Sequence, residues 1–299
     1  MSLAGSCLIS KGLPNTDVWI LALFIPMMGW IAGLYLSDFL DRKLDAIEKP
    51  HRPIPSGRIH PYEALFVGAV FAGTGLIASI YLGFYNLIMV FVVAFLVLGY
   101  AKFTKSKGIL GNLNRGLVTV AAFFYGVFSI NPVISEIPIY IWLLSFVFLF
   151  HDTNSNLVGA IRDMKGDKEG GYNTIPVKFG LKNSIIISFV LTVIWLSITL
   201  FLAIRYNFLK IEFYILMIID FILLLTLYIY LLTSIKGYNR RKALRFHEFF
   251  VIERITLASA LIIGVTNIMF GLLIYIFSLI ITETSQYFLR SRYEFKGEK

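Results

Sequence analysis

The sequence predicts an all-α integral membrane protein that forms one domain over residues 1–299. The first observation is the composition: of 299 residues, 58% are hydrophobic and only 15% are charged, whereas a soluble domain carries about 25% charged residues. The second is a series of apolar runs, each about as long as the 20 residues that cross a bilayer as a helix. The third is that Lys and Arg gather in short loops between these runs. This pattern indicates a membrane topology, and it argues against nucleic acid as the reason for the net charge of +9.

Eight apolar segments are long enough to span a membrane. Residues 2–10 are apolar but too short to cross, and we interpret them as the remaining half of a first helix. A cleaved signal peptide is the alternative, but no basic residue precedes this stretch. The single Cys7 excludes an intramolecular disulfide, and no Cys and His cluster indicates a zinc site. The eight segments lie at about 17–40, 61–82, 85–101, 112–130, 138–161, 183–205, 209–233 and 255–281.

The charge of the connecting loops predicts the orientation. Four loops hold 20 of the 27 Lys and Arg residues, at 41–60, 102–115, 162–182 and 234–254. Positive charge concentrates on the cytoplasmic side of a membrane, so these loops are predicted to be cytoplasmic. The connections on the other side carry only Lys11, Arg205 and Lys210. The basic C-terminal tail falls on that far side if the last segment spans, and a re-entrant or interfacial last segment is the alternative.

Three carboxylates follow the first full apolar run within eight residues, at Asp38, Asp41 and Asp45. If the helix that begins near Val18 continues through them, they fall at i, i+3 and i+7 on roughly one face, with Ser37 one turn before Asp41. Like charges so placed repel one another, and more strongly where water is scarce. A bound cation removes that cost. The alternative is a solvated helix end whose carboxylates pair with neighbouring basic residues.

A second carboxylate pair closes a later apolar run. Asp163 and Asp167 lie four residues apart, and a Gly-Gly pair follows where a helix would stop. Residues 18–60 and 139–182 share the same order of long helix, Asp-x-x-x-Asp pair and basic loop, which places both pairs at equivalent depths on one side of the membrane. Two such pairs across a cavity favour hard cations. Mg²⁺ fits, because it takes one or two carboxylates and completes its shell with water and substrate phosphate.

Two basic loops adjoin the carboxylate pairs. The stretch from Arg52 to Arg58 reads Arg-Pro-Ile-Pro-Ser-Gly-Arg, and its two prolines stiffen the backbone. Arginine suits phosphate oxygens because its fork donates two parallel hydrogen bonds, and Ser56 adds a hydroxyl. A second basic cluster contains Lys105 and follows Tyr100. The alternatives are a loop that only sets topology for the first stretch, and anionic lipid head groups as ligands of the second.

At these residues the sequence resembles the UbiA superfamily of intramembrane prenyltransferases. Members carry Asn-x-x-x-Asp-x-x-x-Asp followed by Arg-Pro-x-Pro-Ser-Gly, and later a second Asp-x-x-x-Asp followed by Gly-x-x-Thr. The resemblance covers nearly the whole chain, and the main departure within the motifs is Ser37 in place of Asn. The matching stretches read Ser37-x-x-x-Asp41-x-x-x-Asp45, Arg52-Pro53-Ile54-Pro55-Ser56-Gly57, Asp163-x-x-x-Asp167 and Gly171-Tyr172-Asn173-Thr174.

The resemblance implies nine transmembrane helices around a central cavity with cytoplasmic cap loops, all within a single transmembrane prenyltransferase domain. It implies that two Mg²⁺ ions bind a prenyl diphosphate, and that the prenyl group passes to a lipophilic acceptor with release of diphosphate. The acceptor would be an aromatic or quinone precursor or a glycerol-phosphate lipid. The protein itself would contact membrane lipids, and neither nucleic acid nor an obligate protein partner is expected. The implied catalytic and metal-binding residues are Asp41, Asp45, Asp163 and Asp167. Asp38 is predicted as a further metal ligand because of its helical face, and the alternative is that it only orients a ligand. The resemblance implies that Arg52 and Lys105 bind the diphosphate, with Tyr100 nearby, and the chemistry of the 52–58 loop adds Ser56 and Arg58 to the predicted diphosphate-binding residues.

Three alternatives remain open from the sequence. A CDP-alcohol phosphotransferase also uses Asp-bound metal, but its motif has Gly where Arg42 follows Asp41 here. A transporter built on repeats binds its coupling cation near the bilayer midplane, whereas these carboxylates lie at helix ends. The third alternative is a non-catalytic relative, which Ser37 in place of Asn and the short first helix suggest.

Overall fold

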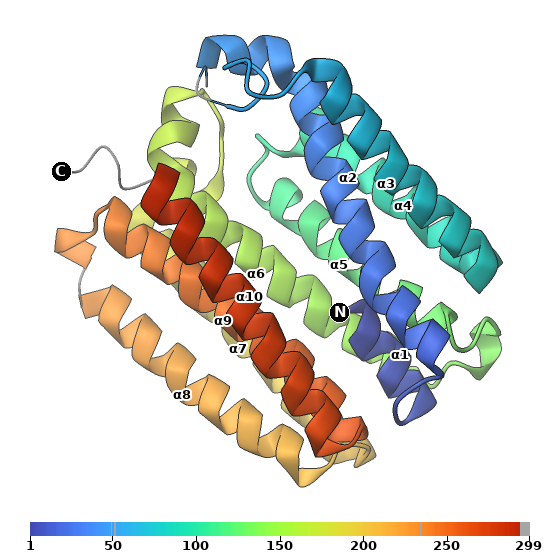
Figure 1. Cartoon of the computed structure of the whole chain (residues 1–299). Helices are drawn as coiled ribbons and strands as arrows, with labels where there is room; N and C mark the ends of the chain where they lie inside the picture. The colour runs from blue at the N-terminus through green and yellow to red at the C-terminus, as the bar shows by residue number, and fades with distance from the viewer. Residues whose placement is uncertain (49, 51, 234, 294–299) are drawn as a thin grey trace.

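The computed structural model describes residues 1–48, 50, 52–233 and 235–293, and every regular element among them is helical (Figure 1). Ten α-helices follow one another, joined by short connections. Their bounds are α1 Ser2–Ser10, α2 Thr16–Glu48, α3 Pro61–Leu82, α4 Phe84–Gly99, α5 Ile109–Phe128, α6 Ile139–Glu169, α7 Ile175–Tyr206, α8 Ile211–Thr233, α9 Arg240–Val265 and α10 Ile268–Tyr293. A π-helical turn at Tyr100–Thr104 and two 3-10 turns at Ile134–Glu136 and Ile235–Gly237 complete the described elements.

Six of these helices are long and apolar enough to cross a membrane, namely α2, α3, α4, α7, α8 and α10. The predicted all-α membrane fold is therefore confirmed, and the protein is an integral membrane protein. The other three long helices, α5, α6 and α9, carry polar side chains in the interior of the bundle, among them Asn112, His151 and Glu253. The count of nine membrane-crossing helices stays a prediction.

The helices form a bundle in which neighbours in sequence run in opposite directions. Figure 1 shows α2, α3 and α4 on one side, α8, α9 and α10 on the other, and α5 and α6 between them. The short helix α1 packs against α2, α5 and α9, and its Leu3, Cys7 and Leu8 are buried. This alternation brings the C-terminal ends of α2 and α6 to the same end of the bundle.

Ionisable side chains inside the bundle pair across helices. His151 Nε2 lies 2.8 Å from Glu253 Oε2, and Arg254 Nη2 lies 2.9 Å from Asp152 Oδ1. Thr119 Oγ1 donates a hydrogen bond to Asp152 Oδ2 at 2.6 Å. A buried charge that loses its partner costs about 3–5 kcal/mol. These pairs therefore fix α5, α6 and α9 relative to one another.

The structure corrects the last predicted span. Residues 255–281 do not form one helix, because α9 ends at Val265 and α10 begins at Ile268. Asn267 Oδ1 accepts a hydrogen bond from Phe270 N at 2.7 Å and so satisfies a free N–H group at the start of α10. Apolar residues on both sides of this turn make it look like the middle of a single span.

Two further predictions change with this turn. The predicted loop 234–254 is largely helix, because α9 already begins at Arg240. Helix α10 then runs back along α9 and ends at Tyr293, at the end of the bundle where α2 and α6 also end (Figure 1). The end of α10, which includes Arg290 and Arg292, therefore lies on the same side as the four basic loops and not on the far side, whereas Lys296 and Lys299 lie outside the described residues.

Candidate active site

The first aspartate motif, formed by Asp38, Asp41 and Asp45, lies on the last three turns of α2. This helix continues without interruption to Glu48, so the predicted spacing on one helical face is confirmed. The three carboxylates differ in exposure: Asp41 is exposed, Asp38 is half-buried and Asp45 is 4% exposed. A carboxylate as buried as Asp45 requires a partner, because burial of an unpaired charge is costly.

Arg52 supplies that partner from the loop after α2. Its Nη1 lies 2.7 Å from Asp45 Oδ2 and 3.3 Å from Asp38 Oδ1. The loop folds back on itself, since Ser56 N donates to the carbonyl of Arg52 at 3.0 Å. One guanidinium therefore bridges two carboxylates of the first motif.

Ser56 and Arg58 lie on the exposed side of this loop. Arg58 Nε donates to Ser56 Oγ at 3.0 Å, and Ser56 Oγ donates to the carbonyl of Pro53 at 3.2 Å. These bonds stay within the loop. Of the three residues predicted here as diphosphate ligands, the structure shows Arg52 bonded to the first motif.

The second aspartate motif, formed by Asp163 and Asp167, lies on the last two turns of α6. The helix ends at Glu169, where the Gly-Gly pair predicts its end. Arg162 bonds both oxygens of Asp163, with Nη2 at 2.6 Å and Nε at 2.9 Å. Each motif thus has an arginine beside it, and the one at Asp163 comes from the adjacent position in the chain.

The chain turns back onto Asp167 immediately after α6. Gly171 has a φ of 72°, a left-handed conformation that suits glycine because it has no Cβ. Tyr172 N then donates to the Asp167 carbonyl at 2.8 Å, and Thr174 Oγ1 donates to Asp167 Oδ2 at 3.1 Å. Thr174 is missing from the predicted site residues, although the Gly-x-x-Thr stretch was the signal that could have assigned it a role.

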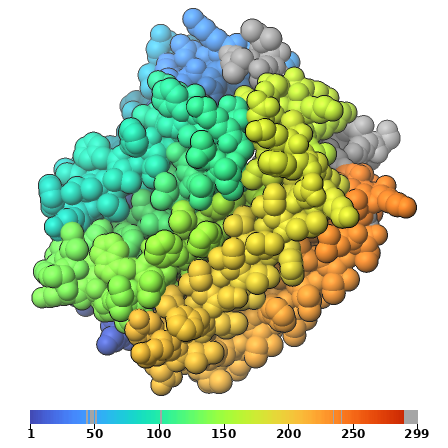
Figure 2. Space-filling model, turned by 180° about the vertical axis from the view of Figure 1, so that it is seen from behind, coloured from blue at the N-terminus to red at the C-terminus, as the bar shows by residue number. Residues whose placement is uncertain are grey.

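The connection between α4 and α5 adjoins the second motif. Asn173 N donates to the carbonyl of Ser106 at 3.2 Å, and Lys105 Nζ lies 5.4 Å from the centroid of the Tyr172 ring. Figure 2 shows the surfaces of the α4–α5 and α6–α7 connections side by side at one end of the molecule. Lys105 is therefore placed beside the turn that holds Asp167, although this position is far from it in the sequence.

The two motifs lie at the same end of the bundle but do not form one metal cluster. Within the described ranges, no three His, Cys, Asp or Glu residues are grouped so that they could hold a metal ion. Helix α2 packs mainly along α3, whereas α6 packs along α5 and α7. The predicted ligand Tyr100 lies against Arg115, whose guanidinium carbon is 5.7 Å from the ring centroid. Arg115 was not singled out from the sequence.

Taken together, the fold and these contacts define a membrane-embedded protein with two carboxylate pairs and several cationic side chains at one end of a helical bundle. A model of the UbiA prenyltransferase family matches residues 1–252. The chain therefore belongs to the UbiA prenyltransferase family, as its motifs indicate, and is a prenyltransferase. Membership favours prenyl transfer over the transporter and the CDP-alcohol phosphotransferase.

Relatives of known name point to one type of product. The chain is 31% identical to a digeranylgeranylglyceryl phosphate synthase from Korarchaeum cryptofilum over 67% of this chain and 70% of that protein. It is 32% identical to one from Sulfurisphaera tokodaii over 63% of this chain and 67% of that protein.

Solved structures share the fold. One of digeranylgeranylglyceryl phosphate synthase in membranes has 26% identity and a TM-score of 0.67, covering 88% of this chain and 91% of that chain. A UbiA homolog from Archaeoglobus fulgidus bound to DMAPP and Mg²⁺ has a TM-score of 0.65, covering 87% of this chain and 94% of that chain. At 17% identity, this second likeness concerns the fold alone.

Proposed function

We propose that this protein transfers a geranylgeranyl group from geranylgeranyl diphosphate to a free hydroxyl of geranylgeranylglyceryl phosphate, with release of diphosphate. The relatives named digeranylgeranylglyceryl phosphate synthase support this acceptor class, because adding one prenyl group to such a lipid makes the product in their name. The main observation in favour of the proposal is that the Arg52 guanidinium lies between Asp38 and Asp45. The second motif lies at the same end of the bundle, where Thr174 donates a hydrogen bond to Asp167.

The side chains at this end fit Mg²⁺ by their chemistry. Every carboxylate of the two motifs is a hard oxygen donor, and each motif presents at least two of them within two helical turns. Mg²⁺ typically binds one or two carboxylates and takes its other ligands from water and phosphate. The Arg52 guanidinium between Asp38 and Asp45 supports the proposal that a cation is favourable at this position.

We assign the metal-binding role to Asp38, Asp41 and Asp45 in the first motif and to Asp163 and Asp167 in the second. One Mg²⁺ would bind at each motif through one or two of these carboxylates, with water and phosphate as the other ligands, so no group of three protein ligands is required. When bound, Mg²⁺ supplies positive charge to the phosphate oxygens and so stabilises diphosphate as a leaving group. Arg52 and Lys105 contact the diphosphate directly in this proposal, and Ser56, Arg58 and Tyr100 contribute from the surrounding loops.

The bond changes in the proposed reaction balance without a redox partner. The bond between the allylic carbon and the diphosphate oxygen breaks, and diphosphate leaves with the electron pair. A new bond forms between that carbon and the acceptor hydroxyl oxygen, whose proton is released to diphosphate or water. Arg52 and Lys105 stabilise the growing charge on diphosphate. The apolar bundle keeps water away from the cationic carbon, which water would otherwise capture.

We further propose that this end of the bundle faces the cytoplasm. The basic loops after α2, α4 and α6 and the basic segment at the start of α9 all lie at this end, and α10 ends there too. Such an excess of Lys and Arg supports a cytoplasmic location.

The test is a product assay with the purified protein in liposomes, supplied with geranylgeranyl diphosphate, geranylgeranylglyceryl phosphate and Mg²⁺. Mass spectrometry is expected to find the acceptor with one added geranylgeranyl group, together with one diphosphate per product. Asp45→Asn should lower the rate more than about tenfold, since even the partners of metal ligands typically contribute that much. Asp17→Asn is the matched control, because Asp17 lies at the opposite end of the same helix and is expected to leave the rate unchanged.

Two results would overturn the proposal. Prenylation of an aromatic acid but not of the glycerol-phosphate lipid would exclude the acceptor class. No product with either acceptor from a folded protein would favour the non-catalytic relative.

A further inference from the structure

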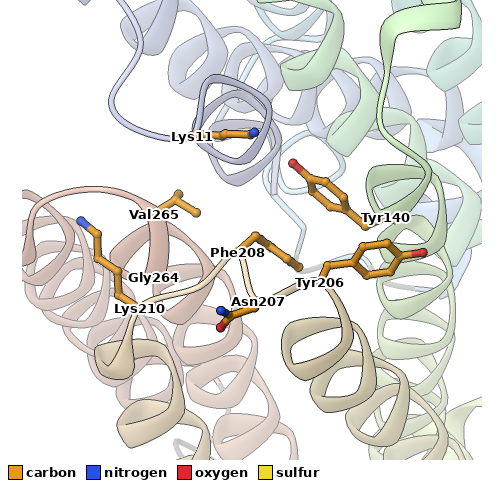
Figure 3. Close-up of a pocket in the computed structure, with 8 residues that line it drawn as sticks. All are labelled: Lys11, Tyr140, Tyr206, Asn207, Phe208, Lys210, Gly264 and Val265. Carbon is orange, nitrogen blue, oxygen red and sulfur yellow. The ribbon is translucent and has the colours of Figure 1, made fainter.

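A pocket of about 370 Å³ (Figure 3) lies where α6 begins and α7 and α9 end, which is the end of the bundle opposite to the two aspartate motifs (Figure 1). It is formed where the connection after α1, the start of α6, the α7–α8 turn and the end of α9 meet. We call it the far pocket. Its lining residues are Lys11, Tyr140, Tyr206, Asn207, Phe208, Lys210, Gly264 and Val265.

The far pocket gathers the positive charge of its side of the membrane. The connections on this side carry three Lys or Arg residues, Lys11, Arg205 and Lys210. Two of them line the pocket, and the Arg205 guanidinium carbon lies 5.7 Å from the ring centroid of a third lining residue, Tyr206. None of the eight lining residues is acidic. Membrane topology disfavours cations on this side, so their convergence at one pocket points to an anionic ligand.

The two lysines have different roles in the pocket. Lys210 N donates to the carbonyl of Gly264 at 2.8 Å, and Lys210 Nζ donates to the carbonyl of Thr266 at 2.7 Å. These bonds tie the α7–α8 turn to the end of α9 and so build one wall. Lys11 is exposed, and among the described residues its amine has no hydrogen-bond partner. Figure 3 shows this amine and the hydroxyl of Tyr140 directed toward one another.

The backbone around the far pocket is also unusual. Lys11 with a φ of 52° and Asn207 with a φ of 45° are the only non-glycine residues with positive φ in the described part of the chain, and both line this pocket. Asparagine tolerates this conformation, whereas lysine is disfavoured in it. The conformation places the Lys11 side chain at the pocket although glycine would be less strained there.

Aromatic rings form the remaining wall. Tyr140 stacks on Phe208 with centroids 4.6 Å apart, and it lies 5.5 Å from the ring of Tyr206. Aromatic side chains of membrane proteins gather at the depth of the lipid head groups. A volume of this size suits a head group or another small molecule. The pocket therefore combines free donors, positive charge and a wall of aromatic rings of the kind that favours head-group depth.

We propose that the far pocket binds a phosphate group, with the Lys11 amine as its charged contact, Lys210 as a further positive charge in the wall and the Tyr140 hydroxyl as a hydrogen-bond donor. The source consistent with its depth is an anionic lipid of the leaflet opposite to the aspartate motifs. A soluble phosphate compound offers the same chemistry, so the experiment must separate these two sources.

The test is native mass spectrometry of the purified full-length protein in a neutral detergent, titrated with phosphatidylglycerol, with uncharged diacylglycerol and with glycerol phosphate. The unmodified protein is expected to retain one phosphatidylglycerol molecule more tightly than any further phosphatidylglycerol molecules that bind to it. Lys11→Gln should weaken this binding about tenfold, the usual effect of losing a charged hydrogen bond, and Lys11→Arg should preserve it. Lys182→Gln is the matched control, because Lys182 is exposed on α7 near the opposite end of the bundle.

Each outcome has a distinct meaning. Selective loss of phosphatidylglycerol binding in Lys11→Gln supports a lipid site. Selective loss of glycerol phosphate binding, with no preferred lipid, supports a phosphate site with a soluble ligand. Equal binding by Lys11→Gln, Lys182→Gln and the unmodified protein, or equal retention of diacylglycerol, would overturn the proposal. None of these readouts depends on prenyl transfer.

Discussion

Replacement of Arg52 by Gln should uncouple the first aspartate motif from the loop that covers it. In the structure Arg52 Nη1 is 2.7 Å from Asp45 Oδ2, and the Asp45 side chain is only 5% exposed. The arginine itself is 36% exposed, and its second partner Asp38 is 41% exposed. Breaking a buried ion pair costs about 3–5 kcal/mol, and breaking an exposed one costs about 0–1 kcal/mol. The mixed exposure places the expected loss in free energy of unfolding at about 2 kcal/mol.

A double-mutant cycle isolates this interaction. Arg52→Gln, Asp45→Asn and the double variant are unfolded in detergent, and the free energies of unfolding are compared. Asp45→Asn removes the charge that pairs with Arg52. The double variant should therefore lose less free energy of unfolding than the sum of the two single variants. We expect a coupling energy of more than 1 kcal/mol, within the range of about 0.5–3 kcal/mol that is typical for residues in contact. A cycle between Arg52 and Asp41 serves as the control. Asp41 is exposed and makes no hydrogen bond to Arg52 among the described residues, so that cycle should be nearly additive.

An Arg52–Asp45 cycle that is additive within about 0.5 kcal/mol, the usual error for independent sites, would refute a direct coupling of these two side chains. The same variant also reports on catalysis. If Arg52 contacts diphosphate, Arg52→Gln should lower kcat/KM by about 10- to 100-fold, as expected for a lost charged hydrogen bond. A stable variant with unchanged kcat/KM would remove Arg52 from the proposed site.

Two further predictions concern the second motif and the helices beneath it. Thr174→Val removes the hydroxyl that donates to Asp167 Oδ2. It should lower kcat/KM about tenfold and raise the Mg²⁺ concentration that gives half-maximal activity. Thr174→Ser keeps the hydroxyl and should restore both values. Unchanged Mg²⁺ dependence in the valine variant would contradict this role. Gly116→Ala places a Cβ 2.5 Å from the backbone carbonyl oxygen of Leu149, so thermal and chemical unfolding should show a loss of about 1–3 kcal/mol. Gly159→Ala, which meets nothing within 4 Å, is the control and should not destabilise the protein.

The helices and the two motifs follow from local patterns that the sequence carries in full. Asp38, Asp41 and Asp45 share a face because α2 continues through them, and α6 stops where Gly170 and Gly171 follow. Hydropathy identifies long apolar helices well because the bilayer sets their length. The turn at Thr266–Asn267 was missed because both sides of it are apolar. Its signal was the Thr-Asn pair, since asparagine commonly caps the start of a helix.

The contacts within the site could not be read from local patterns. The bond between Asn173 and Ser106 joins two connections that are separated by α5 and α6, and it brings Lys105 to the turn that holds Asp167. Such a contact depends on how three helices pack. The choice of Arg52 rather than Arg58 as the partner of Asp45 depends on how the loop folds back, which its two prolines and one glycine restrict but do not determine.

The central claim is that both aspartate motifs act on one diphosphate. Calorimetric titration of the purified protein with a non-reactive thio analogue of geranylgeranyl diphosphate, in the presence and absence of Mg²⁺, tests it most directly. The account predicts one analogue bound per chain, dependence on Mg²⁺, and loss of binding in both Asp45→Asn and Asp167→Asn. Two analogues bound per chain, or full binding in either single variant, would show that the two motifs serve separate ligands and would contradict the account.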